Sequence, residues 1–386
     1  MRRAAALIIV CLLPALALSG CWSYKSLSDI SLVIGVGIDK DPATGDYKLS
    51  AEIVDLTKGI KEGGPGARLI EARGKTIFGA VRDAKRKLLN RLYFGNMQVV
   101  VLGEEVARDV GIRNVSDWLL HDAEIRETIT MLVMKGGRSF DLLTLEGLDQ
   151  SILSLEIDAI ISEDNKITAS TAHSEMYQVY GMLNSPGIAL TLPAFHIAEN
   201  DGEKVPEADG IAIFRGDKLA GYLTSEQTKY YLLAIGKAKG GILTISKDGS
   251  GAPDTSLEIA QSQAKMAYQI TDGRLSFSIE TETDVYLAEE TKAIDMSDDS
   301  AVKALEKEAG ARLQMEIEAV IKKVQAETGS DIYGFGQYLH RHDAKLWHEG
   351  LEDRWEEIFR VLPVSVSCKV NIKNTSSIRS WEGGHK

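Results

Sequence analysis

The sequence has 386 residues and a formal net charge of −12, because its 56 Asp and Glu residues outnumber its 44 Lys and Arg residues. A chain of this length exceeds what one hydrophobic core holds, so we expect two or three domains. The sequence lacks a basic stripe with interleaved aromatic residues, which excludes nucleic acid as a partner. The acidic balance also argues against electrostatic adhesion to anionic lipids.

Residues 1–20 predict a cleaved signal peptide of the lipoprotein type. Two arginines precede the apolar run 4–17. As a helix this run would cover roughly 20 Å, which is short of a hydrocarbon core roughly 30 Å thick, so an export signal is the better interpretation. The run leads into the residues of a bacterial lipobox, which are Leu18, Ser19, Gly20 and Cys21.

We therefore expect Cys21 to be the lipid attachment site and, after cleavage, the first residue of the mature chain. A diacylglyceryl group on its sulfur supplies two acyl chains, which attach a protein stably where one chain does not. This interpretation ties the chain to the exported side of the cell membrane without a spanning segment. The alternative is an ordinary signal peptide that happens to contain Cys21.

Cys368 is the only cysteine that remains when Cys11 is cleaved off and Cys21 is lipidated. A disulfide within the mature chain is therefore excluded. Cys368 lies on the apolar face of a predicted final strand over 364–372, so we interpret it as a small buried hydrophobic residue.

The region 22–200 is expected to form the N-terminal part of the molecule, with two subdomains as one possibility. Apolar residues alternate with others over 30–38, which predicts a half-buried strand. A turn at 41–46 contains Pro and Gly and leads into a second strand, so 30–55 is expected to be a hairpin.

Helical and strand patterns then alternate to about residue 185. Thr76 is a candidate N-cap for the helix that follows it. Pro193 places the predicted strand 188–197 at a sheet edge or at a bulge. The polar residues 199–207 are interpreted as a domain boundary, after which 207–380 forms the C-terminal domain.

The C-terminal domain is predicted to combine long strands with long helices. Two strands, 256–270 and 274–288, flank a Thr-Asp-Gly turn, and the pattern over 298–327 predicts one long helix with Asp298 near its start. A further helix is expected over 343–360. The predicted fold class is α+β, with mixed or antiparallel sheets flanked by helices.

His340, His342 and His348 form the only histidine cluster in the sequence. His348 opens a zinc-protease-like pattern, but Glu352 stands where that pattern requires a second histidine. We therefore expect no metal site.

Glycine-rich runs do not complete a nucleotide-binding motif. Gly35 and Gly37 follow a strand pattern without a third glycine, and Gly334-Phe335-Gly336 lacks the Lys-Ser/Thr of a phosphate loop and is interpreted as a helix-start turn. A G-x-S-x-G motif is also absent from the sequence. We therefore expect no catalytic residues and no cofactor.

Eight short sequence runs, spread over nearly the whole mature chain, carry a resemblance to a known family through the order in which they occur. They are Cys21-Trp22, Gly35 to Lys40, Phe78-Gly79-Ala80, Phe94 to Glu105, Glu124-Ile125-Arg126, Gly210 to Phe214, Lys218 to Gly221, and Asp331 to Gly336 with Trp347. In this order, behind a lipobox, they resemble the Ger(x)C family, the C subunits of nutrient germinant receptors of spore-forming bacteria. Asn96 departs from the family pattern, in which a histidine is expected.

The resemblance implies a non-enzymatic lipoprotein on the outer face of the spore inner membrane. It also implies two integral-membrane partners, the A and B subunits, with which the chain supports the sensing of nutrients. Direct binding of a small molecule by this chain is not expected. The implied fold is α+β with three domains, the third beginning near residue 200.

Two functions from other classes stay open at this point. A substrate-binding lipoprotein of a transporter would require two lobes with a ligand cleft between them. A cell-wall hydrolase lipoprotein would require paired carboxylates or a metal.

Overall fold

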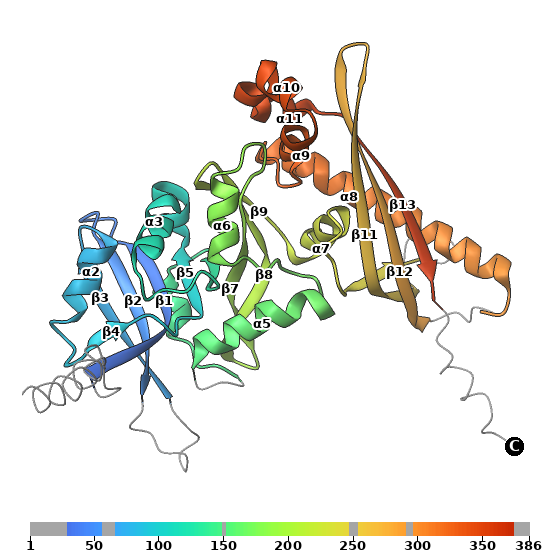
Figure 1. Ribbon diagram of the computed structural model, residues 1–386. Coiled ribbons are helices and arrows are strands. Elements are labelled where there is room, and N and C mark those ends of the chain that lie inside the picture. Colours follow the sequence, from blue (N-terminus) through green and yellow to red (C-terminus); the bar gives the residue numbers. More distant parts are fainter. Residues whose placement is uncertain (1–28, 56–65, 149–151, 247–253, 291–295, 374–386) are drawn as a thin grey trace, which may run out of the picture.

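The computed structural model describes residues 29–55, 66–148, 152–246, 254–290 and 296–373. The signal peptide and the lipobox with Cys21 lie outside these residues. The described residues form a nine-stranded sheet, built from the N-terminal half and β7 to β9, and a separate four-stranded sheet near the C-terminus (Figure 1). Within the described residues, no helix has the length and apolarity needed to cross a membrane.

The nine-stranded sheet has the order β3-β2-β1-β5-β6-β7-β8-β9, with β4 pairing with the start of β1. β5 and β6 run parallel to β1, whereas β2 and β3 form an antiparallel edge and β7, β8 and β9 form another. The strands are β1 (Ile30–Lys40), β2 (Tyr47–Asp55), β3 (Gly66–Gly74), β4 (Arg91–Tyr93), β5 (Val99–Gly103), β6 (Thr130–Met134), β7 (Thr191–Asn200), β8 (Glu203–Arg215) and β9 (Lys218–Leu223).

Helices cover both faces of this sheet (Figure 1). One face packs against α2 (Ile77–Ala84), α3 (Arg113–His121), α6 (Met176–Leu183) and a π-helical turn (Val106–Val110). The other face packs against α4 (Ser139–Leu143) and α5 (Leu153–Ile167). Thr76 caps α2 as predicted, because its hydroxyl accepts a hydrogen bond from the Gly79 N–H at 3.0 Å.

The prediction of a half-buried first strand was wrong, because β1 is buried on both faces. The face that carries Gly35 and Gly37 receives the first residues of α5 and α4. A Cβ on Gly35 would lie 2.7 Å from the Cβ of Ser154, and a Cβ on Gly37 would lie 2.5 Å from Ser139 Oγ. The two glycines therefore mark close helix packing, which alternation alone does not distinguish from a solvent-facing side.

The polar segment 199–207, which was interpreted as a domain boundary, lies in the hairpin formed by β7 and β8. β7 and β8 pair antiparallel around the turn Asp201-Gly202 and belong to the same sheet. The predicted bulge at Pro193 is confirmed, since the register between β7 and β8 shifts between Pro193 and Phe195.

The four-stranded sheet has the order β10-β11-β12-β13. The two long strands and the long helix agree with prediction: the turn Asp272-Gly273 has positive φ at both positions, and Asp298 accepts a hydrogen bond from the Ser300 N–H at 2.8 Å. The elements are α7 (Ser225–Ala234), β10 (Ile242–Ile245), β11 (Thr255–Thr271), β12 (Arg274–Glu290), α8 (Asp299–Glu327) and β13 (Val364–Ile372).

The single helix expected over 343–360 is broken into short pieces. Asp343 ends one helix and caps the next by accepting from the Leu346 N–H at 3.0 Å, and Gly350 has a non-helical φ of 164°. α9 (Phe335–His342) precedes the predicted range, and the pieces are α10 (Ala344–Leu346), a π-helical turn (Trp347–Leu351), a 3-10 turn (Glu352–Arg354) and α11 (Trp355–Val361).

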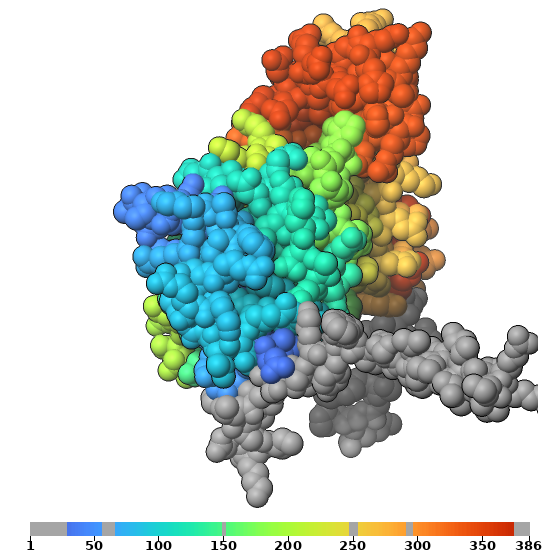
Figure 2. Space-filling view, turned by 60° about the vertical axis from the view of Figure 1, so that its left-hand side comes forward, coloured from blue at the N-terminus to red at the C-terminus, as the bar shows by residue number. Residues whose placement is uncertain are grey.

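The two sheets are joined by a shared core. Ile211 and Ile213 of β8 and Leu223 of β9 belong to the same buried cluster as α7, α8 and Phe335. Figure 2 shows the C-terminal elements in orange and red standing above and behind the blue and green N-terminal part. The two halves are therefore packed directly against each other.

Candidate functional site

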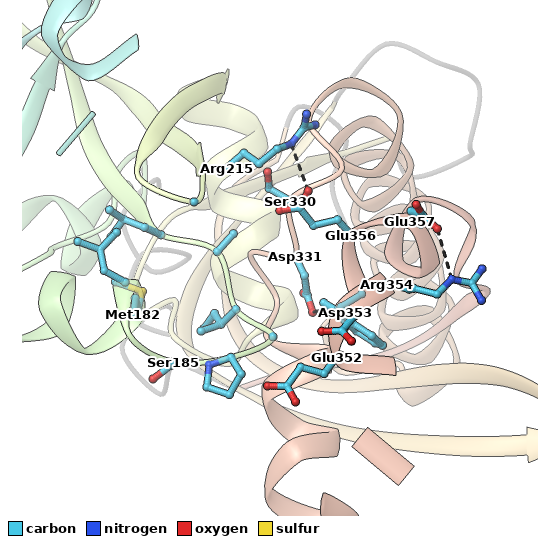
Figure 3. Close-up of a pocket in the computed structure, with 18 of the residues that line it drawn as sticks. Met182, Ser185, Arg215, Ser330, Asp331, Glu352, Asp353, Arg354, Glu356 and Glu357 are labelled. Atoms are coloured by element: carbon cyan, nitrogen blue, oxygen red, sulfur yellow. Dashed lines mark hydrogen bonds and ion pairs between the residues drawn. The ribbon is translucent and has the colours of Figure 1, made fainter. Parts of the chain in front are cut away.

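A cleft of about 490 Å³ lies between the two halves (Figure 3). From the N-terminal half it is lined by residues 182–183 at the end of α6, by residues 185–190 before β7, and by the β8–β9 turn at Arg215 and Gly216. From the C-terminal half it is lined by residues 330–331 and 352–357 with Trp347. We call it the interdomain cleft.

Asp331 is the most heavily bonded side chain at this cleft and is only 4% exposed. Its Oδ1 accepts hydrogen bonds from the N–H groups of Tyr333 at 3.1 Å and Gly334 at 2.8 Å. Its Oδ2 accepts from the Gly336 N–H at 2.9 Å and from Trp355 Nε1 at 3.0 Å. The carboxylate thus holds the start of α9 and the start of α11 at one point.

Burial acts against the charge of this carboxylate. Desolvation raises the pKa of Asp331 to about 6, although the four donated hydrogen bonds favour the ionised form. A perturbed carboxyl in a cleft is a candidate functional group. Its donors, however, are three backbone amides and an indole, so all of its bonding positions serve to hold the local structure.

The two halves touch backbone to backbone beside Asp331. The Ala189 N–H donates to the Asp331 carbonyl at 2.7 Å, and the Gln337 N–H donates to the Gly187 carbonyl at 2.8 Å. Gly187 has a φ of 68°, and a Cβ on Gly336 would lie 2.7 Å from its Cα. Glycine at both positions permits this close approach between the two halves.

The rim of the cleft is mostly acidic. Arg215 of β8 lies 3.9 Å from Glu356 of α11, an ion pair that joins the two halves across the opening (Figure 3). Arg354 pairs with Glu357 at 3.5 Å on the same side. Both pairs are exposed to solvent and contribute little to stability.

Two further buried carboxylates also hold helix starts, on the face of the large sheet that packs against α4 and α5. Asp39 accepts from the N–H groups of Ser139 and Phe140 at 2.8 and 3.0 Å, and Glu52 accepts from those of Leu153 and Ser154 at 2.9 Å each. Each therefore caps the first turn of α4 or α5 from a strand about 100 residues away in sequence. Burial raises the pKa of both carboxyls.

The histidines do not form a metal centre in the described chain. The rings of His340 and His348 lie edge to face at 5.5 Å, His342 stacks on Tyr338, and His348 Nδ1 lies 2.7 Å from Glu352. No group of three or more His, Cys, Asp or Glu residues with metal-binding geometry occurs among the described residues.

Cys368 lies on the inward face of β13, partly buried against the C-terminal core. Burial raises the pKa of its thiol to about 11, so it is protonated and unreactive at neutral pH. This agrees with its interpretation as a small hydrophobic residue.

The predicted site residues Leu18, Ser19, Gly20 and Cys21 lie outside the described residues, so their role stays a prediction. The residues that the sequence did not single out for a site are Asp331, Gly187 and Trp355. The sequence feature that could have pointed to Asp331 is the run Asp331 to Gly336. In that run the sequence predicted only the helix-start turn. Gly334, with a φ of 77°, is indeed the N-cap of α9.

Comparison with known families decides which proteins this arrangement belongs to. A model described as "Spore germination protein N-terminal domain" matches residues 23–197, and one described as "Spore germination B3/ GerAC like, C-terminal" matches residues 209–376. The chain belongs to the Ger(x)C family of spore germination proteins. This is the family of germinant receptor C subunits.

Two relatives of this Ger(x)C protein match along nearly their full length. Spore germination protein KC of Bacillus subtilis (strain 168) is 25% identical over 405 residues, which cover 97% of each chain. Spore germination protein B3 of the same organism is 23% identical, and the alignment covers 94% of this chain and 96% of that protein. The crystal structure of the GerBC protein shares the fold, with a TM-score of 0.55, 19% identity and coverage of 91% of this chain and 100% of that chain.

Proposed function

We propose that this chain is the lipid-anchored, non-enzymatic C subunit of a nutrient germinant receptor. In this proposal it acts with integral-membrane A and B subunits to support the sensing of nutrients and spore germination. The observation that carries the proposal is the match to the two family models over 23–197 and 209–376. The interdomain cleft adds support, because its buried carboxylate is occupied by capping bonds and is not paired with a nucleophile.

The proposed location is the outer face of the spore inner membrane, with a lipid on Cys21 as the anchor. Confinement to a surface raises the effective concentration of a protein toward its membrane partners. Weak contacts with the A and B subunits then suffice for assembly, which suits a chain whose described residues lack a spanning helix.

In this role the chain would move as one body. The backbone bonds between Ala189 and Asp331 and between Gly187 and Gln337, together with the shared core, resist hinge motion between the halves. A conformational change in a membrane partner would therefore be transmitted from one half to the other and not absorbed at the interdomain cleft.

The cleft itself favours a second candidate function, the substrate-binding lipoprotein of a transporter. Such a protein requires a cleft between two lobes, and the cleft of about 490 Å³ has the size of a small-molecule site. The crossing backbone bonds count against it, because ligand-driven closure requires a hinge. Tight 1:1 binding of an amino acid or sugar to the purified chain, measured by calorimetry, would favour this candidate.

The experiment that tests the receptor proposal is affinity capture of the tagged chain from spore membranes solubilised in mild detergent. We expect two multi-span proteins, the A and B subunits, to be captured in comparable amounts. Recovery of a permease with an ATP-hydrolysing subunit would instead support the transporter candidate. Recovery of the chain alone, from a detergent that keeps other membrane complexes intact, would contradict a stable receptor.

A further inference from the structure

The segment 85–91, which connects α2 to β4 and includes the first residue of β4, is basic in an otherwise acidic chain. Its sequence is Lys-Arg-Lys-Leu-Leu-Asn-Arg, which contains four cations and no carboxylate. The four cations, Lys85, Arg86, Lys87 and Arg91, are all exposed. We call this segment the basic loop.

An apolar side chain projects from the centre of the basic loop. Leu89 is 91% exposed, more than any other large apolar side chain in the described part of the molecule. Its neighbour Leu88 is partly buried and packs against the core of the N-terminal sheet. The loop therefore presents one leucine to solvent while the other holds the loop to the body.

The charges of the basic loop are only partly neutralised within the chain. Arg86 pairs with Asp83 at 3.2 Å, and Arg91 pairs with Glu124 at 2.6 Å. The ammonium groups of the lysines contact carbonyl oxygens instead. Lys87 Nζ donates to the Glu71 carbonyl at 2.5 Å, and Lys85 Nζ donates to the carbonyls of Leu88 and Leu89. Carbonyl contacts leave both lysine charges in place, so the loop carries a net positive charge.

The basic loop lies beside the point where the described chain begins. Arg91 pairs with Ile30 in the parallel β4–β1 ladder, and Asn90 Nδ2 donates to the Ile30 carbonyl at 3.4 Å. Figure 1 shows β4 against the start of β1 at the lower left of the molecule, whereas α11 lies at the opposite, upper end. Ile30 follows Cys21 by nine positions, so even a fully extended chain separates the two by at most about 30 Å.

We propose that the basic loop is a membrane-contact site that binds anionic phospholipid headgroups through Lys85 and Lys87 and inserts Leu89 at the boundary between headgroups and acyl chains. The proposal rests on the proposed lipid anchor at Cys21, which brings this end of the molecule to the bilayer. Insertion removes an exposed leucine from water, and each lysine near an anionic surface strengthens binding about fivefold.

The net charge of the whole chain gave the opposite expectation, that adhesion to anionic lipid is disfavoured. The difference follows from screening, because charges act over about 8–10 Å at physiological ionic strength. A local cluster at the anchored end therefore decides the interaction, and acidic residues in the distant C-terminal half do not cancel it. Two attachment points, the lipid and the loop, would also fix how the molecule stands on the membrane.

The test uses the full lipidated chain reconstituted into vesicles, with an environment-sensitive fluorophore on a cysteine at position 89. The background substitution Cys368→Ser leaves Leu89→Cys as the labelled thiol. Val361→Cys is the matched control, because Val361 is 78% exposed and lies on α11 at the far end. We expect the probe at position 89 to be quenched by a lipid-borne quencher on phosphatidylglycerol-containing vesicles, and the probe at 361 to stay in water.

Charge variants separate headgroup binding from simple proximity. Lys85→Gln with Lys87→Gln should shift the docked–undocked equilibrium of the loop by on the order of 25-fold toward water. Lys237→Gln with Lys239→Gln removes the same charge at the same spacing from exposed positions in the other half and should leave the quenching unchanged.

A probe at 89 that stays as water-exposed as the probe at 361 on these vesicles would overturn the proposal while leaving the anchor intact. Quenching that is equal on neutral phosphatidylcholine vesicles would overturn the headgroup part of it. The mass of the N-terminal peptide reports separately whether Cys21 carries lipid. If it carries none, the anchor is refuted and Cys21 is a second thiol, so the measurement is repeated with Cys21→Ser added, and quenching at 89 on anionic vesicles then decides for or against the loop.

Discussion

Trp355 Nε1 donates a hydrogen bond to Asp331 Oδ2 at 3.0 Å, and this bond ties α11 to the loop that begins α9. The same carboxylate accepts hydrogen bonds from three backbone N–H groups at the start of α9, so one side chain holds the starts of both helices. The backbone hydrogen bonds that join the two halves, which we call the joint, lie directly beside Asp331. The stability of the folded chain should therefore respond to changes at Asp331 and Trp355.

Trp355→Phe removes the indole donor and leaves an aromatic ring in place. We expect a loss of about 1–3 kcal/mol in the free energy of unfolding, because a hydrogen bond to a buried charged group is lost. Urea unfolding followed by circular dichroism at neutral pH measures the change.

Trp118→Phe is the matched control for this change. Trp118 is buried to a similar extent and contacts one aromatic ring, Phe94, but its Nε1 makes no hydrogen bond to a described residue. The same truncation there should cost less. Equal costs at the two positions would show that only ring volume matters and that the bond to Asp331 contributes nothing.

The pH dependence of stability tests the electrostatics of Asp331. Burial raises the pKa of Asp331 in the folded chain to about 6, from an ordinary value of 3.8. Between pH 4 and pH 6, Asp331 is therefore protonated in the folded chain and ionised in the unfolded chain. Its contribution to stability is therefore fully present below pH 4 and is lost as the pH rises through 6, a change of roughly 3 kcal/mol.

The variant Asp331→Asn isolates this contribution, since asparagine does not titrate. We expect its destabilisation relative to the unchanged chain to be larger at pH 4 than at pH 7.5. Asp39 and Glu52 are present in both chains and cancel in the comparison. A larger destabilisation at pH 7.5 would mean that the four N–H donors outweigh the desolvation of the carboxylate.

Gly187→Ala should disrupt the contact between the halves. The position has a φ of 68°, and an added Cβ would collide with the backbone of Gly336. We expect a loss of about 2–5 kcal/mol from the strained backbone and the clash together.

Gly181→Ala, only six positions earlier, should have the opposite sign. Gly181 lies within α6 with open space where a Cβ would be, so alanine should stabilise the chain by about 0.5–1 kcal/mol. Thermal melting of both variants decides the matter. A neutral Gly187→Ala would contradict a tightly closed joint.

The sequence predicted the fold best where one pattern sufficed. The long hairpin around Asp272-Gly273 and the helix over 298–327 follow from periodicity and local caps, and both are present. Prediction failed where packing between distant segments decides the outcome. Gly35 and Gly37 appeared to face solvent because the pattern carries no information about the helices that cover them.

The joint was missed for the same reason. Gly187 and Gly336 are about 150 residues apart, and neither looks unusual without the other. The run Asp331 to Gly336 was recognisable as part of the family resemblance, but the partners that give Asp331 its role could not be derived from it. The basic residues of the loop can be read from the sequence. Their proposed role in membrane contact depends on the position of the loop beside Ile30, which only the structure shows.

Cys21→Ala tests the proposed anchor. Without the thiol that receives the lipid, the chain should either appear in the soluble fraction or stay unprocessed with its signal peptide, and nutrient germination should be impaired. Fractionation and mass spectrometry of the N-terminus measure this. Cys368→Ser, which removes the partly buried cysteine, should leave the distribution unchanged. Normal function in Cys21→Ala would show that partner contacts alone retain the chain.

The central claim, that the chain is a component of a nutrient germinant receptor, is tested most directly by the germination of spores that lack it. Germination is followed by the loss of optical density, once with nutrients and once with non-nutrient agents. The account predicts that response to the nutrient served by this receptor is abolished and restored by the intact gene, while non-nutrient germination is unchanged. Equal loss of both responses would contradict it.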